Sequence, residues 1–217
     1  MPEITPGSWF RLFFGILPRI PLKFCGLNPI KQAIRASIDT KEQLVADDAL
    51  LDRIRRVTDL LIDTYRNDGK VLFCGNGGSA GDAQHIAAEL SGRFYYDRPP
   101  LYAEALHVNS SYLTAVGNDY GYDEVYARMV RAAGRPGDVL VGISTSGNSP
   151  NVLKAIAAAR ERGMHVVGMT GTSGGKMTEL VDLLLNIPSS ATPRIQESHI
   201  LVGHIVCELV EAALFPR

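Results

Sequence analysis

The stretch Lys70-Val71-Leu72-Phe73-Cys74-Gly75-Asn76-Gly77-Gly78-Ser79 decides the fold of this chain. It begins with a short apolar run, Val71 to Cys74, of the kind found in strands that are buried on both faces of a parallel sheet. A glycine-rich turn at Gly75 to Gly78 follows, and a helical pattern then continues through Leu90. A buried strand, a tight turn and a helix in succession form the first unit of an α/β fold.

Outward from this unit, strands and helices continue to alternate along the chain. Further strands are expected near Ala103 to Val108 and over Val139 to Ile143, Val166 to Thr170 and Leu183 to Ile187. Further helices are expected between Ser111 and Ala133, over Pro150 to Arg162, briefly near Lys176, and from about Ile195 to Leu214. This alternation predicts an α/β fold with a doubly wound parallel sheet that is covered by helices on both faces.

Two amphipathic helices are expected ahead of the sheet. Apolar residues recur at steps of three and four from Ile30 to Val45 and again from Leu50 to Tyr65. At 217 residues, the chain is near the upper size of a single domain. We therefore expect one domain over residues 28–217 that includes these two leading helices. Residues 1–27 are expected to form a mobile N-terminal extension.

The composition excludes several classes of partner. The 22 basic and 23 acidic residues nearly cancel and form no basic cluster, which argues against nucleic acid. Cys25, Cys74 and Cys207 show no CxxC spacing, so they predict neither a disulfide framework nor a thiolate zinc site, and they favour the cytoplasm. Charges and prolines interrupt the apolar segment from Trp9 to Cys25, so no stable membrane insertion is expected. A weak membrane or partner contact of this segment stays open.

Two turns that follow strands have an unusual composition. The glycines of Gly75 to Gly78 allow a close approach of the backbone to a ligand, and Ser79 adds a hydroxyl at the helix start. The segment Ser144 to Ser149 places four hydroxyl groups within six positions, directly before Pro150. Ordinary N-capping explains one of these hydroxyls but hardly four. Because helix N-termini bind anions, we interpret this segment as a phosphate cradle.

Two helices carry candidate metal ligands. His85 and Glu89 are four residues apart, so they share one helix face with Cβ atoms about 6 Å apart. Such a pair is able to bind a metal, although a surface contact is its commoner role. On the last helix, Gln196 and His204 are offset by roughly 80°, so they converge only if the glutamine side chain reaches across. His199 and His204 also both fit the pattern of a half-buried structural histidine.

In their order and spacing, these segments resemble the sugar isomerase (SIS) domain proteins and, within them, the bacterial phosphoheptose isomerases. The resemblance covers the chain from about Ile30 to Phe215. Its markers are Cys74-Gly75-Asn76-Gly77-Gly78-Ser79, Asp82-Ala83-Gln84-His85, Ala88-Glu89-Leu90, Gly117-Asn118-Asp119, Ile143-Ser144-Thr145-Ser146-Gly147-Asn148-Ser149, Met169-Thr170-Gly171, Gly174-Gly175 and Arg194-Ile195-Gln196-Glu197-Ser198-His199. Each marker is modest alone, and the set is specific.

The resemblance implies an SIS fold, which is a flavodoxin-like sandwich, and an isomerase that converts D-sedoheptulose 7-phosphate to D-glycero-D-manno-heptose 7-phosphate. It implies a homotetramer with sites between subunits and a role in heptose synthesis for surface polysaccharide. One zinc ion per subunit is expected, with His85, Glu89, Gln196 and His204 as its ligands.

The resemblance also assigns the substrate contacts. Phosphate is expected at Ser144, Thr145, Ser146 and Ser149 with help from Ser79. Sugar hydroxyls are expected at Asn76, Gly77, Gly78, Asn118 and Asp119, with Arg93 close by. Glu89 and Gln196 are expected to contact the substrate as well as the metal.

Moving a carbonyl between C1 and C2 requires one group for the carbon proton and one for the oxygen proton. We assign the carbon proton to Glu89 and the oxygen or ring-opening proton to His204, with zinc polarising the carbonyl. Because a carboxylate bound to zinc is a weaker base, Glu89 is interpreted as ligand, as base, or as each at different stages. Pro193 stands where some relatives have Asp, and Ala80 where others have His, so no acid/base role of that Asp operates here.

Two alternatives are retained. One SIS relative binds the replication initiator protein and performs no isomerase chemistry, but its branch lacks the residues that match Glu89 and His204, which are both present here. The other alternative is a different sugar-phosphate isomerase, or an aminosugar-phosphate lyase, of the same superfamily. Those proteins usually lack the pair formed by Gln196 and His204.

Overall fold

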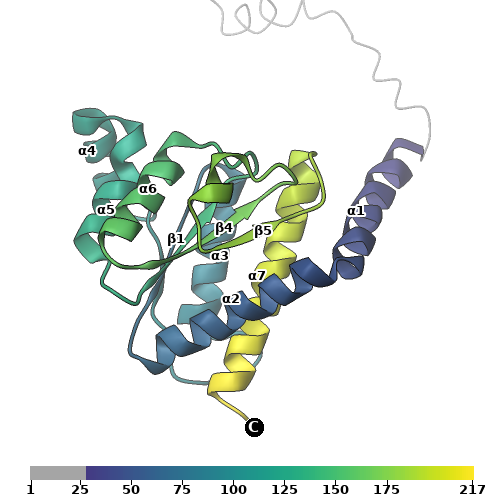
Figure 1. Ribbon diagram of the computed structural model, residues 1–217, viewed down its shortest axis with the longest axis horizontal. Coiled ribbons are helices and arrows are strands. Elements are labelled where there is room, and N and C mark those ends of the chain that lie inside the picture. Colours follow the sequence, from purple (N-terminus) through teal and green to yellow (C-terminus); the bar gives the residue numbers. More distant parts are fainter. Residues whose placement is uncertain (1–27) are drawn as a thin grey trace, which may run out of the picture. The chain divides into compact units, whose positions relative to one another are not determined.

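The computed structural model describes residues 28–217 (Figure 1). The expectations for residues 1–27, including their mobility, lie outside the described residues. Arg35–Arg217 forms one compact unit, and the chain up to Ile34 is assigned to a separate one. The sheet and all the predicted site residues lie in the larger unit.

The strands and helices of the described residues alternate as the sequence predicts. The strands are β1 (Val71–Gly75), β2 (Ala103–Ala105), β3 (Val139–Ile143), β4 (His165–Thr170) and β5 (Leu183–Asn186). The α-helices are α1 (Asn28–Ala46), α2 (Asp48–Arg66), α3 (Gly78–Ser91), α4 (Ser110–Tyr120), α5 (Val125–Ala133), α6 (Pro150–Glu161) and α7 (Thr192–Leu214). Two short 3-10 helices are η1 (Tyr122–Glu124) and η2 (Gly175–Glu179).

The strands form one parallel sheet in the order β2-β1-β3-β4-β5. The chain leaves β1 toward one edge of the sheet to form β2 and then returns to the other side of β1 to form β3. In a doubly wound sheet, ligands bind beyond the carboxyl ends of the strands at this switch point. The prediction of a doubly wound parallel sheet is confirmed, and the turns after Gly75 and Ile143 flank the switch point.

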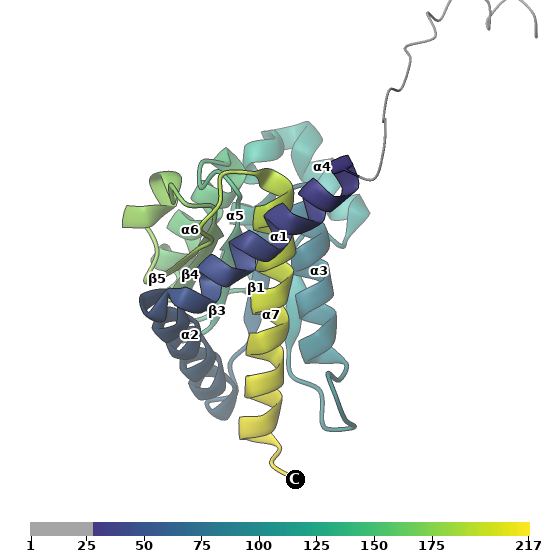
Figure 2. The ribbon, with the colours of Figure 1, turned by 90° about the vertical axis from the view of Figure 1, so that its right-hand side faces the viewer.

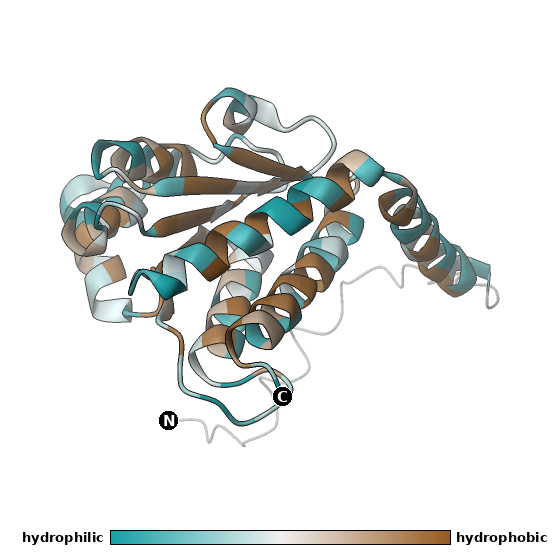
Figure 3. Cartoon of the chain, turned by 60° about the horizontal axis from the view of Figure 1, so that its bottom comes forward, coloured by the Kyte–Doolittle hydropathy of each residue, from teal (hydrophilic) through white to brown (hydrophobic). Residues whose placement is uncertain are grey.

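Side chains of each strand alternate between two cores. On β1, Val71 and Phe73 belong to the core that α2, α3 and α7 cover, whereas Leu72 and Cys74 belong to the core under α5 and α6. Figure 2 shows α3 and α7 side by side on the first of these faces. Because both faces of the sheet are buried, the strands are apolar at nearly every position, as Figure 3 shows.

One predicted helix is divided in the structure. The helix expected between Ser111 and Ala133 consists of α4, the short η1 and α5. Gly121 ends α4 with a φ angle of 87°, a backbone conformation that side-chain-bearing residues rarely adopt. The break turns Tyr122 toward the end of β1, where its hydroxyl donates a hydrogen bond to Oδ1 of Asn76 at 3.2 Å.

Candidate active site

The glycine turn after β1 packs against the start of α7. Gly77 has a φ angle of 56°, in the region that favours glycine. A Cβ atom at Gly78 would lie 2.8 Å from Cδ of Gln196, so any larger residue at Gly78 would displace the Gln196 amide from its position. The turn therefore meets a predicted site residue of the last helix, and Ser79 is buried directly behind it.

Asn76 links this turn to the second predicted ligand loop. Its Nδ2 donates to Oδ1 of Asn151 at 2.9 Å, and Nδ2 of Asn151 donates to Oδ1 of Asn76 at 2.8 Å. Asn151 lies in the first turn of α6, directly after the hydroxyl-rich segment. The sequence analysis missed Asn151 and Tyr122. The one signal in the sequence was an amide residue directly after Pro150, and the structure shows that this residue is buried. This amide pair holds the two loops together across the switch point.

The hydroxyl-rich segment forms a compact cluster at the end of β3. Oγ of Ser144 lies 2.9 Å from Oγ of Ser149 and 3.5 Å from Oγ of Ser146. A cavity of about 200 Å³ adjoins the cluster, and its lining residues are Thr145, Ser146, Gly171, Thr172, Ser173, Ser189, Ser190, Thr192 and Ile195. No charged side chain lines this cavity. Hydroxyl groups rotate between donating and accepting, so this lining suits an anion that is held without Lys or Arg.

Three possible metal ligands converge between α3 and α7. Nε2 of His85 lies 3.1 Å from Oε1 of Glu89 and 3.4 Å from Nε2 of His204. One ligand atom from each residue lies within 4.8 Å of the other two. Helix geometry accounts for the pair on α3, and the packing of α7 supplies the third member.

Gly203 brings the two helices close enough for this convergence. A Cβ atom at Gly203 would lie only 2.5 Å from Cδ1 of Ile86. Each of these residues is adjacent in sequence to a member of the cluster, Ile86 to His85 and Gly203 to His204. The close helix contact therefore lies directly beside the three ligand atoms.

The donor set suits a catalytic zinc ion. Two imidazoles and one carboxylate are a ligand combination that zinc accepts in catalytic sites. The side chain of His85 is 49% exposed and that of Glu89 is 26% exposed, so the cluster is accessible to a substrate. We call His85, Glu89 and His204 the ligand cluster.

His199, the other histidine near the start of α7, has a different environment. It is fully buried, and its Nε2 donates to the carbonyl oxygen of Thr170 at 3.1 Å. Burial lowers its pKa to about 4, so the ring is neutral near pH 7. His204, and not His199, lies in the ligand cluster.

The remaining predicted residues are not brought into the cluster. Gln196 is eight residues before His204, which is about 12 Å along the helix axis, and its role as a ligand stays a prediction. Arg93 is exposed in the loop after α3. Asn118 and Asp119 are exposed in the last turn of α4, where Nδ2 of Asn118 donates to Oδ1 of Asp119 at 2.9 Å.

Asp82 is a polar group in this region to which the sequence analysis gave no role. It lies three residues before His85 on α3, on the same side of the helix. Burial raises its pKa to about 6, and the nearby His85 opposes this shift. Asp82 is thus a carboxyl group that titrates close to neutral pH beside the cluster.

Comparisons with known proteins agree with this geometry. Residues 34–171 match the family model of the SIS domain. The phosphoheptose isomerase of Aneurinibacillus thermoaerophilus is 53% identical over 186 residues, which cover 86% of this chain and 94% of that protein. This chain belongs to the phosphoheptose isomerase family. Another member of the family, from Rhodospirillum rubrum, is 63% identical over 151 residues, or 70% of this chain and 80% of that one.

A solved structure of this family extends the match to three dimensions. The phosphoheptose isomerase from Neisseria gonorrhoeae has a TM-score of 0.80 at 47% identity, covering 85% of this chain and 98% of that chain. The fold of the family is thus present, and the chain is an isomerase of sugar phosphates. Among residues 28–217, none of the helices has the length and the apolar character needed to span a bilayer.

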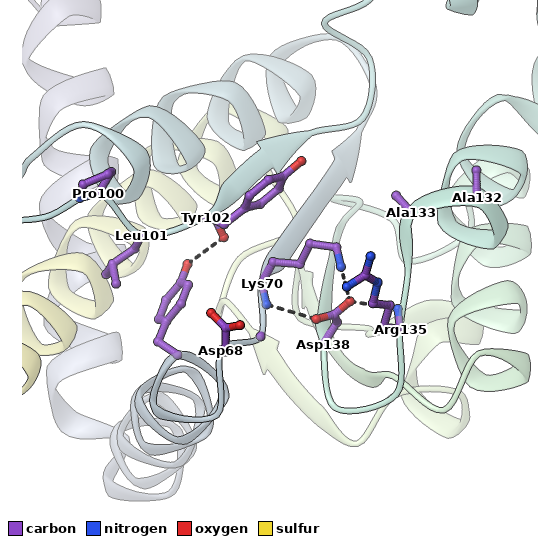
Figure 4. Close-up of a pocket in the computed structure, with 11 residues that line it drawn as sticks. Asp68, Lys70, Pro100, Leu101, Tyr102, Ala132, Ala133, Arg135 and Asp138 are labelled. Atoms are coloured by element: carbon purple, nitrogen blue, oxygen red, sulfur yellow. Dashed lines mark hydrogen bonds and ion pairs between the residues drawn. The ribbon is translucent and has the colours of Figure 1, made fainter.

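A larger cavity, of about 570 Å³, lies at the opposite end of the sheet (Figure 4). It is bordered by the amino ends of β1, β2 and β3, with Lys70, Tyr102, Arg135 and Asp138 among its lining residues. None of the predicted phosphoheptose isomerase residues lines it. The glycine turn and the hydroxyl cluster, in contrast, lie at the carboxyl ends of β1 and β3, where the strand order leads us to expect a ligand.

Proposed function

We propose that the protein converts D-sedoheptulose 7-phosphate to D-glycero-D-manno-heptose 7-phosphate at a zinc site, and that it does so in the cytoplasm, for surface-polysaccharide heptose. The observation that carries this proposal is the convergence of one possible ligand atom each from His85, Glu89 and His204 between α3 and α7. The glycine turn and the hydroxyl-rich segment at the switch point of the sheet support it as candidate phosphate contacts. The names of relatives at 53% and 63% identity supply the class of substrate.

The metal would be held by His85, Glu89 and His204, with Gln196 as a fourth ligand. The amide end of Gln196 lies against Gly78 of the glycine turn, so its side chain would have to change direction to reach the cluster. Zinc, when bound, supplies a Lewis acid that polarises the substrate carbonyl.

The substrate would lie along the carboxyl ends of β1 and β3. Its phosphate would take hydrogen bonds from Ser144, Thr145, Ser146 and Ser149, with Ser79 at the start of α3. Each hydrogen bond to such a charged group is worth about 1.5 to 3 kcal/mol. Contacts to the sugar hydroxyls would come from Asn76, Gly77, Gly78, Asn118 and Asp119, with Arg93 nearby.

Two side chains of the ligand cluster would move protons. Glu89, which is partly exposed, would take the proton from carbon. His204 would transfer the proton at oxygen or during ring opening. Its ring lies 4.9 Å from the ring of His85 and 5.6 Å from that of Phe94, centroid to centroid, and these contacts restrict its orientation.

A homotetramer with sites between subunits is the assembly that we propose. Its support is apolar surface on α1 and α7 that has no partner within the described chain. Ile38 is 41% exposed, Val45 70% and Leu209 44%. Side chains of this kind are covered when subunits associate.

The proposal is tested with purified protein and sedoheptulose 7-phosphate, with and without zinc. We expect the aldose heptose 7-phosphate to form, its formation to stop after chelation, and zinc to restore it. A protein that forms no product with zinc present, and that captures the replication initiator instead, would be a scaffold and not an isomerase.

A further inference from the structure

The guanidinium group of Arg98 caps the carboxyl-terminal end of α3 by hydrogen bonding to its carbonyl groups. Its Nη1 donates to the carbonyl oxygens of Leu90 at 2.7 Å and Gly92 at 3.1 Å, and its Nη2 donates to that of Glu89 at 2.9 Å. These carbonyls have no partner within the helix, because the last turn of an α-helix leaves its acceptors free. Arg98 thereby holds the main chain of Glu89, a member of the ligand cluster.

The partner of Arg98 is on the other helix of the cluster. Nε of Arg98 donates to Oε1 of Glu211 at 3.0 Å, and the two side chains are 2% and 1% exposed. Glu211 is seven residues after His204, so both residues lie on one face of α7, two turns apart. The ion pair therefore joins α3 to α7 on the side that carries the ligands.

Glu211 also fixes the loop that follows α3. Its carboxylate accepts hydrogen bonds from the backbone N–H groups of Phe94 at 2.8 Å and Tyr95 at 2.7 Å. Burial disfavours its charge, but these N–H groups and Arg98 outweigh the burial and lower the pKa of Glu211. The ring of Phe94, held in this way, packs against the ring of His204.

We propose that Arg98 and Glu211 are positioning residues that set the distance of His85 and Glu89 from His204. The proposal rests on the proposed metal-dependent function of this cluster. Neither residue touches the cluster through its own side chain. They act through the main chain of Glu89, the ring of Phe94 and the spacing of α3 and α7.

A second buried ion pair provides a matched control. At the amino end of the sheet, Asp138 accepts the backbone N–H groups of Lys70 at 3.0 Å and Arg135 at 2.8 Å, together with Nζ of Lys70 at 2.6 Å. The carboxylates of Glu211 and Asp138 thus each accept hydrogen bonds from two backbone N–H groups and from one cationic side chain. Buried ion pairs contribute little net stability, but breaking one of them is costly. Replacing either carboxylate by an amide makes the same chemical change at two separate buried ion pairs.

The experiment compares Glu211→Gln, Arg98→Lys and Asp138→Asn with the wild-type protein. Zinc affinity is measured by competition with a chelating dye, and the visible spectrum of bound Co²⁺ reports the coordination geometry. Histidine side-chain NMR signals are recorded on the metal-free proteins. Thermal unfolding shows how far each substitution weakens the fold.

We expect the two amides to lower the unfolding temperature similarly, whereas only Glu211→Gln weakens zinc binding, by about tenfold or more. Of the two amide variants, only Glu211→Gln should also change the Co²⁺ spectrum and the signals of His85 and His204. Arg98→Lys keeps the positive charge but loses the several N–H donors of the planar guanidinium group. Its zinc affinity should therefore lie between those of the wild-type protein and Glu211→Gln.

Equal zinc affinities and unchanged histidine signals in Glu211→Gln would overturn the positioning role, as would equal losses in Asp138→Asn. A wild-type protein that binds no zinc would instead refute the proposed function. In that case the histidine signals of the metal-free variants still decide the positioning role. If Glu211→Gln does not fold, Arg98→Lys provides the same comparison.

Discussion

The two ends of the parallel sheet share their strands but differ in chemistry. The amino end has the larger cavity, and its buried charges are already paired, Lys70 with Asp138. The carboxyl end has a cavity of about 200 Å³, together with hydroxyls and a glycine turn, and the ligand cluster follows farther along the helices that begin there. Helix N-termini with free N–H groups lie only at the carboxyl end of such a sheet. The difference teaches that the chemistry of the lining groups, and not the size of a cavity, is the better guide to a candidate site.

The largest effect is expected from Glu89→Gln, which tests whether the ligand cluster is catalytic. The amide is nearly isosteric but accepts no proton, so turnover should fall by about 100- to 10,000-fold while substrate binding survives. His204→Gln should give a fall of similar size. Steady-state kinetics and zinc content are the measurements. Metal lost with activity makes Glu89 chiefly a ligand, and metal retained without activity makes it chiefly the base.

The matched change at the amino end is Asp138→Asn, which should lower the unfolding temperature and leave turnover at its wild-type value. Near-normal turnover in both Glu89→Gln and His204→Gln would refute the assignment of proton transfer to these two residues.

Much of the carboxyl end could be predicted because its signals are local in sequence. Strand β1, the glycine turn and helix α3 are contiguous, and His85 and Glu89 lie on one face by helix spacing alone. The division at Gly121 was missed because an apolar pattern runs through the break and one glycine does not reveal its φ angle. The helix expected to begin at Ile195 begins at Thr192, since Pro193 fits a first turn.

The contacts between distant segments were beyond prediction. Ile86 against Gly203 and the Arg98 to Glu211 pair each depend on how α3 packs on α7. No local pattern in the sequence encodes that packing, because each partner alone fits an ordinary helix or loop residue. The amide pair of Asn76 and Asn151 is of the same kind.

A second prediction concerns the hydroxyl cluster. Replacing Ser144 and Ser146 by Ala removes two donors, each worth about 1.5 to 3 kcal/mol toward a charged phosphate, so KM should rise by roughly tenfold or more for each. The turnover number should change little. Competition by inorganic phosphate, measured in the same assay, should weaken in parallel. An unchanged KM in a folded variant would show that phosphate binds elsewhere.

A third prediction concerns the close approach of α3 and α7. Gly203→Ala places a methyl group against Ile86, and overpacking of this kind costs about 1 to 3 kcal/mol in unfolding free energy. Because the contact adjoins the ligand cluster, zinc affinity should fall as well. The double variant Gly203→Ala with Ile86→Val makes room for the methyl group and should recover part of both losses. Denaturant unfolding and zinc titration measure them.

The last prediction concerns the pH dependence of stability and rests on His199. This residue is buried, and its Nε2 donates to the carbonyl oxygen of Thr170 at the end of β4. Burial lowers the pKa of His199 to about 4 from an ordinary value of 6.5. The unfolded chain therefore binds the proton more readily, and the contribution of His199 to stability is complete above pH 6.5.

Below pH 6.5, that contribution should decline by about 1.4 kcal/mol for each pH unit until the pH approaches 4. The measurement is the unfolding free energy of His199→Gln relative to the wild-type protein at several pH values, because the difference cancels other groups such as Asp82. The destabilisation caused by the substitution should shrink as the pH falls from 6.5 toward 4. A destabilisation by His199→Gln that is constant across this range would mean that His199 binds a proton in the folded protein as readily as in the unfolded chain, and the carboxyl end of β4 would then be open to water.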